Sequence, residues 1–271
     1  FIVYKSDFTS LIMIKVKIKI FRKIVHVFTG HGLGNLWLVK KSKLFFMNQF
    51  KENYAEIQGH KMFLDTLFEP ISVTGIWEPL QTQYIKNNVK EGNFVLDLGA
   101  HIGYFTLNFS ELVGKDGKVF AFEPNPKNFS LLKKNVLVNN FKNVELIQKA
   151  VSDKEEKIKL FLSDTNSGDN RIFDIKDHVK TIDIESIRLD NFLISDLNKN
   201  NFIKMDIQGA EVKALKSMLS LLDKNKPLKI ISEFWPFGIK GAGDKPEEFL
   251  NMLVNSNFKI NRINHIDRKI E

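Results

Sequence analysis

A glycine-flanked turn after a short apolar run is the strongest local signal for chemistry in this sequence. The run Val95–Leu98 contains the acid Asp97, and the stretch from Gly99 to Gly103 follows it directly. Glycines at such a turn let the backbone approach a ligand closely at the carboxyl end of a strand. We therefore predict a ligand-binding crevice at this turn.

The spacing of this turn argues against a nicotinamide dinucleotide. The dinucleotide fingerprint is G-x-G-x-x-G. Counted from Gly99, its other two glycine positions hold His101 and Tyr104. Side chains at those positions would obstruct a pyrophosphate at the helix N-terminus. The turn suits a ligand without phosphate, such as an amino acid joined to a nucleoside.

An acidic residue at the end of the next apolar run supports a nucleoside. Glu123 and Pro124 follow Phe122, about 24 residues after Gly99. A carboxylate at this place can accept hydrogen bonds from both ribose hydroxyls. Two signals at this separation are more specific than either alone. The alternative is that Asp97 and Glu123 are acids that merely end strands.

Short apolar runs alternate with longer amphipathic stretches from about residue 90 onward, which is typical of βαβ units around a parallel sheet. Core strands are expected at Phe94–Leu98, Val119–Phe122, Val144–Ile147, Phe202–Met205 and Leu228–Glu233. Helices are expected at Tyr104–Val113, Pro126–Asn140, Gly209–Leu222 and Pro246–Ser256. The looser β-like pattern of Ile158–Leu193 predicts strands or a flap inserted between the third and fourth core strands.

The composition fits one large domain and excludes cysteine chemistry. The chain has 271 residues, of which 43% are hydrophobic, and no cysteine, so we expect a reducing, cytoplasmic location. Its net charge of +8 comes with acidic residues interspersed through most of the chain, which does not favour nucleic-acid binding. No run of about 18 uncharged apolar residues occurs, so we predict no membrane span. Nothing in the sequence indicates an oligomeric state.

Residues 1–70 are expected to form an N-terminal extension, partly helical or irregular, ahead of an α/β domain at 71–271. Within the extension, the apolar residues of Ile14–Ile20 alternate with lysines, and Met13 is a candidate for the true start. We interpret this part as a leader or surface extension. Weak peripheral association with a membrane is the alternative.

Six phrases of the sequence occur together in a specific order and spacing. They are Ser72–Pro79 (SVTGIWEP), Leu96–Gly103 (LDLGAHIG), Ala121–Pro124 (AFEP), Lys149–Ser152 (KAVS), Ile203–Glu211 (IKMDIQGAE) and Glu233–Pro236 (EFWP). With them, the chain from about Ile71 to Ile260 resembles the FkbM-type methyltransferases, which use S-adenosylmethionine. The resemblance implies a Rossmann-like class I methyltransferase fold, with a mostly parallel sheet and helices on both faces.

The resemblance also implies which residues bind S-adenosylmethionine. Gly99 and Gly103 would lie under the methionine portion with Asp97 bracing their loop, and Glu123 would hold the ribose. Ala150 stands where a backbone group usually meets adenine. The neighbouring Lys149 replaces the acid that many methyltransferases use for the adenine amino group, so Gln148 and Ser152 are alternatives for that contact. The implied cofactor set is completed by Glu78, Ala100, His101, Pro124 and Asp206.

The candidate catalytic residues are Asp206 and Glu233, which end strands that are neighbours in the usual order of this fold. Both carboxylates would face the crevice. Methyl transfer to oxygen needs in-line alignment and removal of the hydroxyl proton, and either carboxylate could act as base. The two could instead hold Mg²⁺, but we favour a base without metal. His101 is a third candidate base, although we favour its interpretation as a turn residue packed near the cofactor.

Several other residues of these phrases have structural interpretations. Lys204 is expected to extend its amine outward from a strand, and Glu211 to be a first-turn acid that complements the helix dipole. The aromatic residues Trp77, Tyr104 and Trp235 could line an acceptor pocket or belong to the core.

The resemblance suggests methylation of a hydroxyl on a sugar, a glycan or a secondary metabolite. N- or C-methylation on the same fold is one alternative, and a non-catalytic nucleotide-binding or adaptor domain is another. The combined spacing of Asp97, Gly99, Gly103, Glu123 and Asp206 favours an enzyme, because an adaptor has no need of it.

Overall fold

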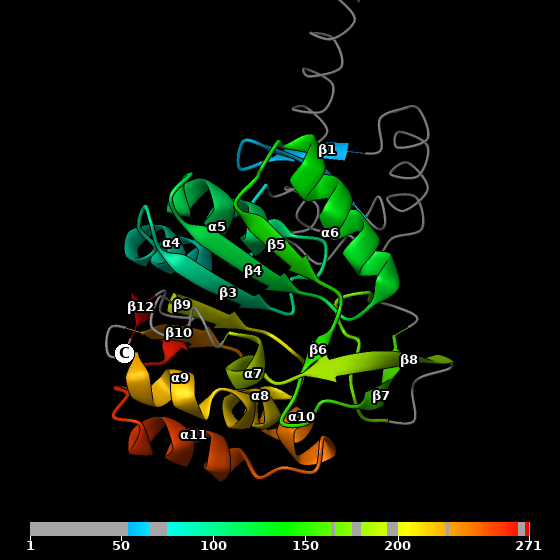
Figure 1. Cartoon of the computed structure of the whole chain (residues 1–271), viewed down its shortest axis with the longest axis vertical. Coiled ribbons are helices and arrows are strands. Elements are labelled where there is room, and N and C mark those ends of the chain that lie inside the picture. Colours follow the sequence, from blue (N-terminus) through cyan, green and yellow to red (C-terminus); the bar gives the residue numbers. More distant parts are fainter. Residues whose placement is uncertain are drawn as a thin grey trace, which may run out of the picture.

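The computed structural model describes residues 54–64, 75–163, 166–174, 180–193, 200–225, 228–264 and 269–270. At its centre lies a five-stranded parallel sheet with the strand order β10-β9-β3-β4-β5. Helices cover both faces of this sheet, as Figure 1 shows. The predicted α/β fold with a parallel sheet is therefore confirmed.

The strands of the central sheet are short and largely buried. They are β3 (Phe94–Leu98), β4 (Lys118–Phe122), β5 (Val144–Ile147), β9 (Asn200–Met205) and β10 (Lys229–Ser232). Apolar strands of this length suit a parallel sheet that is covered on both faces. The predicted strands differ from these at most at their ends. The largest difference is in β9, which begins at Asn200 and not at Phe202.

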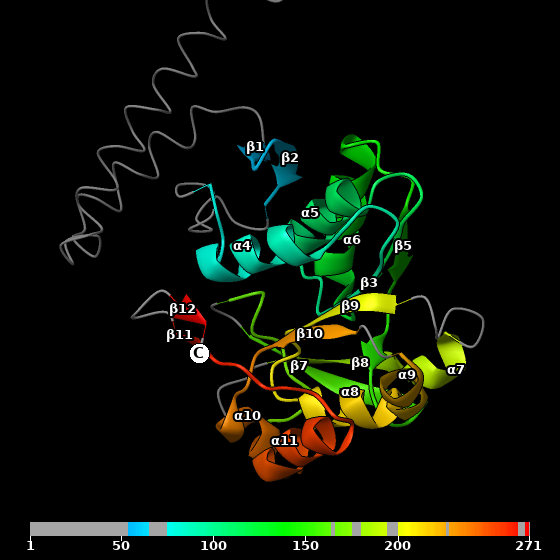
Figure 2. The same ribbon diagram turned by 90° about the vertical axis from the view of Figure 1, so that its left-hand side faces the viewer.

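Two helical layers enclose the sheet, and Figure 2 shows one on each side of it. One layer consists of α4 (Pro79–Asn88), α5 (Tyr104–Val113) and α6 (Pro126–Val138). The other contains α8 (Glu211–Ser217), α9 (Leu219–Lys224) and α11 (Pro246–Asn255), with the short α7 (Leu189–Phe192) and α10 (Pro236–Gly241) nearby. The single helix predicted over Gly209–Leu222 is in fact two, since Met218 interrupts it.

Alternate residues of each strand enter different cores, because successive side chains point to opposite faces. Leu96 and Leu98 join the core beneath α8 and α11, whereas Val95 joins the core beneath α5 and α6. Phe202 belongs to that second core as well. The residues two positions further along these strands, Asp97 and Lys204, therefore face the α5 layer.

The start of α6 is fixed by the asparagine and proline that precede it. Asn125 is the N-cap, and its side chain accepts a hydrogen bond from the backbone N of Lys127 at 2.9 Å. Pro126 is the first helical residue. An asparagine N-cap followed by a proline at the first helical position is a favoured start for a helix, and it sets α6 directly after Glu123.

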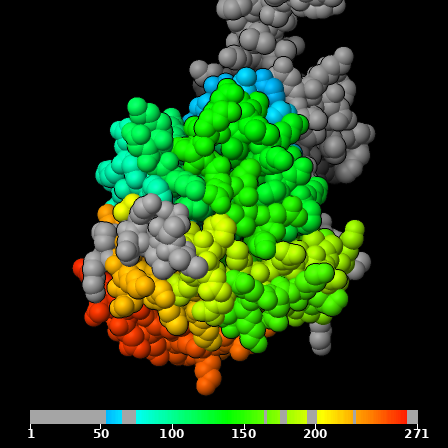
Figure 3. Space-filling view, viewed as in Figure 1, coloured from blue at the N-terminus to red at the C-terminus, as the bar shows by residue number. Residues whose placement is uncertain are grey.

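The part of the chain between β5 and β9 forms a separate small sheet, as expected for the stretch predicted to be inserted there. It consists of β6 (Ala150–Val151), β7 (Lys157–Leu162) and β8 (Lys180–Ile187) in the order β6-β8-β7, with β7 and β8 antiparallel. In Figure 3, β8 lies at the surface in yellow-green, beside the lower helical layer. Residues 166–174 lie between β7 and β8 and reach the functional crevice.

Part of the predicted N-terminal extension forms a β-hairpin, β1 (Tyr54–Ile57) and β2 (His60–Phe63). Asn135 of α6 accepts from the backbone N of Phe63 at 2.6 Å and donates to its carbonyl oxygen at 3.0 Å. Asn139 makes the same pair of bonds with Lys61, at 2.9 and 2.8 Å. The two amides thus pair with the edge of β2 as a neighbouring strand would, and they dock the hairpin on α6.

The rest of the predicted extension, with Met13 and the lysine-rich alternation of Ile14–Ile20, lies outside the described residues, as do Ser72–Thr74. Near the other end, β11 (Ile263–Asn264) pairs with β12 (Lys269–Ile270). Among the described residues, no helix is both long and apolar enough to cross a bilayer.

Candidate active site

A cleft of about 1400 Å³ opens at the carboxyl ends of the central strands. Most of the predicted site residues line it, namely Glu78, Gly99, Ala100, His101, Glu123, Pro124, Ala150, Asp206 and Glu233. The cleft extends along β10 to Phe249 and Leu253 of α11. Asp97 and Gly103 are not part of the lining and lie behind it.

The two glycines of the first turn are required by contacts within the protein. Gly99 has a φ of +79°, and a Cβ there would lie 1.9 Å from the carbonyl oxygen of Asp206. Gly103 has a φ of +99°, and its Cβ would lie 2.7 Å from Leu132. Both values of φ disfavour other residues. The glycines therefore let the turn pack directly against the end of β9 and against α6, which brings Asp206 to the turn.

Glu123 is buried at the end of β4 and braces the turn. Its two carboxylate oxygens accept hydrogen bonds from the backbone N atoms of His101 and Asn125, both at 2.9 Å. Burial raises the pKa of Glu123 to about 7, although these hydrogen bonds act in the opposite direction. Asn128 also donates to Oε1 at 3.5 Å, whereas Oε2 keeps a second lone pair, so Glu123 can hold the turn and still accept a hydrogen bond from a ligand.

Lys204 corrects one sequence-based expectation. Its amine does not extend outward to solvent, because the residue is only 4% exposed. The Nζ atom donates to the carbonyl oxygen of Gly99 at 3.1 Å and lies 3.7 Å from Asp97 and 3.6 Å from Asp206. Burial acts to lower the pKa of Lys204, but the carboxylates around it outweigh burial and raise it. Lys204 is the cation at the centre of the site.

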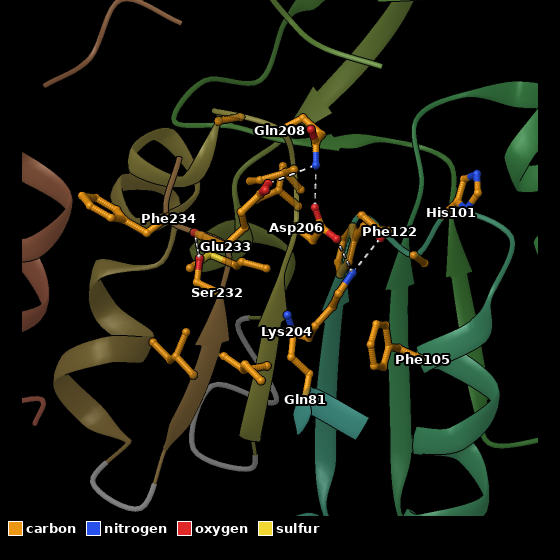
Figure 4. Close-up of a pocket in the computed structure, with 18 of the residues that line it drawn as sticks. Gln81, His101, Phe105, Phe122, Lys204, Asp206, Gln208, Ser232, Glu233 and Phe234 are labelled. Carbon is orange, nitrogen blue, oxygen red and sulfur yellow. Dashed lines mark hydrogen bonds and ion pairs between the residues drawn. The ribbon is translucent and has the colours of Figure 1, made fainter. Parts of the chain in front are cut away.

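Asp206 and Glu233 are brought together as predicted, and Gln208 links them. The Nε2 atom of Gln208 donates to Asp206 at 2.8 Å and to Glu233 at 3.0 Å. Figure 4 shows the Gln208 amide above the two carboxylates, with Lys204 below Asp206. The three polar side chains come from the ends of β9 and β10 and from the turn after β9.

Two of the carboxyl groups in this cluster hold their protons more tightly than usual. Burial, together with the charges of Asp206, Glu211 and Glu78, raises the pKa of Glu233 to about 7. Burial and the charge of Asp206 raise the pKa of Glu78 to about 6. One carboxylate oxygen of Glu78 is buried without a hydrogen-bond partner. Near neutral pH, such groups can exchange protons with a reactant.

Glu211 has the structural place predicted for it. It lies in the first turn of α8, where its carboxylate accepts from the backbone N atoms of Ile207 at 3.4 Å and Gly209 at 3.3 Å. Burial raises its pKa to about 7. Glu211 thereby fixes the turn that carries Gln208.

His101 has a left-handed backbone, with a φ of 51°. Its imidazole lies apart from the carboxylates in Figure 4, and its Nε2 atom lies 2.9 Å from the hydroxyl oxygen of Ser167. Asn128 of α6 donates to the carbonyl oxygen of the same serine at 2.9 Å. Ser167 therefore contacts the turn on the side of Glu123.

The predicted adenine region is lined by Lys149 and Ala150. The Lys149 amine pairs with Glu185 at 2.9 Å. The alternatives for the adenine contact, Gln148 and Ser152, are not among the lining residues. Asn166, which the sequence reasoning passed over, does line the cleft.

Three aromatic residues were candidates for an acceptor pocket. Trp77 and Tyr104 line the cleft, and Trp77 is 42% exposed. Trp235 is not in the lining; its ring packs against Phe173 and beneath the Arg171 guanidinium. Phe234, also 42% exposed, lines the cleft in its place. Successive side chains of an extended segment point in opposite directions, and this alternation after β10 was the signal that could have distinguished Phe234 from Trp235.

Comparison with known proteins assigns the family. A model described as the methyltransferase FkbM domain matches residues 97–260, which is more than half of the chain. The chain belongs to the FkbM methyltransferase family. This confirms the resemblance on which the site residues were named, and the matched region contains the glycine turn, Glu123, Asp206 and Glu233.

Two curated relatives share part of this sequence. Methyltransferase 1 of Beauveria bassiana is 24% identical over 148 residues, which cover 47% of this chain and 59% of the relative. The tRNA wybutosine-synthesizing protein 2 of Saccharomyces cerevisiae is 40% identical over 81 residues, which cover 26% of this chain and 17% of the relative. The FkbM-family chain thus spans less than two thirds of either protein.

Solved structures of methyltransferases are also similar to this chain. One is an S-adenosylmethionine-dependent methyltransferase from Aquifex aeolicus, with 20% identity and a TM-score of 0.38 over 72% of this chain and 86% of the other. Another is the methyltransferase FkbM from Methylobacillus flagellatus KT, with 16% identity and a TM-score of 0.40 over 68% of this chain and 46% of the other.

The cleft of this FkbM-family protein suits a cationic ligand of the kind that methyltransferases use. Glu78, Asp206 and Glu233 line it beside the buried cation Lys204. Glu78 has a buried oxygen available as an acceptor. For the Mg²⁺ alternative, no group of three potential metal ligands is found within the described part of the chain.

Proposed function

We propose that this FkbM-family protein transfers the methyl group of S-adenosylmethionine to a hydroxyl oxygen of a sugar, a glycan or a secondary metabolite. The observation that carries the proposal is the placement of Asp206 and Glu233 beside the glycine turn, in one cleft with Glu123. When bound, S-adenosylmethionine supplies a methyl group activated by a positively charged sulfur. The residues of the chain then have to hold this cofactor, align the acceptor and take its proton.

The cofactor-binding half of the proposal rests on the turn and on Glu123. Glu123 is fixed by two backbone hydrogen bonds with its carboxylate in the cleft wall, which supports a role at the ribose. Ala100, His101 and Pro124 line the same part of the cleft. Asp97 braces the turn from behind, since it accepts a hydrogen bond from Thr106 at 2.6 Å and faces Lys204.

The methionine end of the cofactor carries an α-ammonium group and the sulfonium. We assign Glu78 to this end, because its unpartnered buried oxygen can accept a hydrogen bond from an ammonium. Three carboxylates against one lysine also leave an excess of negative charge there. In a partly buried site this excess favours a cation more strongly than it would in water.

The acceptor half rests on the carboxylates and the neighbouring aromatic side chains. A carboxylate with a raised pKa can accept the hydroxyl proton near neutral pH, and Glu233 has this property. Trp77 and Phe234 expose part of their apolar surface in the cleft. Such surfaces suit the C–H faces of a sugar ring, while the carboxylates accept hydrogen bonds from its hydroxyls.

A methyl-transfer assay tests this proposal. The purified protein is incubated with methyl-labelled S-adenosylmethionine and a panel of sugars, nucleotide sugars, oligosaccharides, amines and transfer RNA. We expect label in an O-methyl ether of a sugar-type or hydroxylated acceptor. Label only on nitrogen, on carbon or on RNA would contradict the proposed acceptor class.

Two variants test the role of the carboxylates in the same assay. Asp206→Asn and Glu233→Gln keep the shape of the side chain and remove its charge. We expect both to retain the fold and to lose most of the turnover. Undiminished turnover in either variant removes that residue from catalysis, and Glu145→Gln, a half-exposed acid paired with Lys118, is the matched control.

A further inference from the structure

We propose that Glu233, and not Asp206, takes the acceptor's proton, and that Gln208 is the positioning residue that holds the two carboxylates in place and apart. This inference rests on the proposed function, since it names the base at the same site. It is carried by the asymmetric surroundings of two carboxylates that share one amide donor. Gln208 itself touches neither a reacting atom nor the cofactor in this account.

The shared amide fixes the two carboxylates relative to each other. Nε2 of Gln208 has two hydrogen atoms, and its distances of 2.8 Å to Asp206 and 3.0 Å to Glu233 allow one bond to each. An amide nitrogen donates and cannot accept. Gln208 therefore presents both carboxylates with a donor, which favours their ionised forms, and it prevents them from sharing a proton directly.

The second partner of each carboxylate differs. Asp206 lies 3.6 Å from the Lys204 ammonium through its Oδ2 atom, whereas its Oδ1 atom is used by Gln208. Each oxygen of Asp206 thus already has a partner, a hydrogen bond at Oδ1 and an ion pair at Oδ2. Within the described part of the chain, Glu233 forms no ion pair, and Gln208 uses only its Oε2 atom. The Oε1 atom of Glu233 is therefore open to the acceptor's hydroxyl, and burial raises the pKa of Glu233 to about 7, which suits a group that takes a proton near neutral pH.

The backbone holds the Gln208 side chain in this place. Gln208 has a φ of 53°, in the left-handed region, and Gly209 follows with a φ of +101°. A Cβ on Gly209 would lie 2.6 Å from the backbone of Gly238, so the turn is packed against α10. Glu211 accepts hydrogen bonds from Ile207 and Gly209 on either side of Gln208. The turn is therefore fixed independently of the amide, and removing the amide leaves the turn in place.

The resulting proton transfer is simple. As the acceptor oxygen forms its bond to the methyl carbon, the bond from that carbon to sulfur breaks and its electron pair stays on sulfur. The acceptor O–H bond breaks, and its proton forms an O–H bond with Glu233. Deprotonated Glu233 is restored when it gives this proton to water. Asp206 stays paired with Lys204 throughout.

The test uses two substitutions that keep the length of the side chain. Gln208→Met removes the amide, and Gln208→Glu replaces the donor with a third carboxylate. Gln83→Met is the matched control, because Gln83 lies on the exposed surface of α4 and donates to Asn87 there. The titration of Glu233 is followed in each protein by NMR of ¹³C-labelled side-chain carboxyl groups, without acceptor, and the affinity for S-adenosylmethionine is measured by calorimetry.

We expect the titration midpoint of Glu233 to move to higher pH in both Gln208 variants. The shift should be roughly one pH unit in Gln208→Glu, because a like charge at hydrogen-bond distance disfavours ionisation. It should be smaller in Gln208→Met, which loses only a donor. Affinity for S-adenosylmethionine should stay within about threefold of the parent in Gln208→Met, a change of less than about 0.7 kcal/mol. Gln83→Met should change neither quantity.

Catalysis provides the second readout. With an acceptor from the methyl-transfer panel, the rising limb of kcat against pH should move upward in Gln208→Met by the same amount as the Glu233 titration. A limb that follows the titration of Asp206 instead overturns the assignment. So does an unchanged Glu233 midpoint in both variants, or a tenfold loss of cofactor affinity in Gln208→Met, which would place Gln208 in the cofactor site.

The two proposals fail separately. A parent protein that does not bind S-adenosylmethionine refutes the proposed function, whatever Glu233 does. A parent that binds the cofactor and transfers methyl groups, but whose Glu233 titrates independently of Gln208, refutes only the positioning role.

Discussion

The Nζ atom of Lys204 lies 3.7 Å from Oδ1 of Asp97, and the two residues are register partners on the neighbouring strands β9 and β3. Both side chains are almost fully buried. Lys204 also donates to Gly99 and faces Asp206. One buried cation therefore connects the two strand ends that form the floor of the cleft.

Breaking this pair should destabilise the fold strongly. Removal of one partner of a buried ion pair leaves an uncompensated charge and typically costs about 3–5 kcal/mol. We expect Lys204→Met to lower the free energy of unfolding by about this amount, measured by urea denaturation. The double variant Lys204→Met/Asp97→Asn should recover part of the loss. Lys118→Met, which breaks a half-exposed pair with Glu145, should cost less than about 1 kcal/mol. If Lys204→Met and Lys118→Met lower the free energy of unfolding equally, Lys204 does not have a central role.

Stability should fall as the pH rises through neutrality because of the buried glutamates. Burial raises the pKa of Glu123 and of Glu211 to about 7 from an ordinary value of 4.5. Between these values the folded chain binds more protons than the unfolded chain, so these groups favour folding below pH 4.5 and lose that contribution as pH rises through 7. The urea midpoint measured at increasing pH across this window should decline in the parent and decline less in Glu123→Gln. Parallel curves for the two proteins would show that Glu123 titrates normally.

The asparagine pair on α6 should contribute unequally to the docking of the β1–β2 hairpin. Asn135 bonds both backbone groups of Phe63 and also donates to Ile102 in the glycine turn at 2.7 Å. Its replacement leaves buried backbone groups unpaired. We expect Asn135→Ala to cost roughly 1–3 kcal/mol and to speed amide exchange at Phe63. Asn139→Ala breaks bonds to Lys61 that are exposed to water, and it should cost less. The reverse order would mean that the hairpin is held by other contacts.

The sequence was sufficient to predict the central sheet, because its strands are short and mostly apolar and longer amphipathic stretches separate them. The carboxyl ends of such strands fix where a ligand binds, which is why Glu123, Asp206 and Glu233 were named correctly as cleft residues. Helix α4 was not predicted. It has no clear apolar stripe, and its N-cap, Glu78, has a left-handed backbone and makes no side-chain capping bond.

Lys204 and Gln208 show what the sequence could not reveal. A lysine within a strand normally extends its amine to solvent, and only the pairing of β9 with β3 places it opposite Asp97. The role of Gln208 depends on a left-handed backbone that redirects its side chain across the strand ends. Phe234 and Trp235 are different, because side chains alternate along the extended segment after β10, and this alternation could have shown that only one of the two faces the cleft.

Binding of S-adenosylmethionine, measured by calorimetry on the folded protein, tests the account most directly. We predict binding of one cofactor per chain, weakened by about 1–3 kcal/mol in Glu123→Ala because a charged acceptor is lost, and unchanged in Glu145→Ala. A folded parent protein that releases no heat with S-adenosylmethionine, or a Glu123→Ala variant with full affinity, would contradict it.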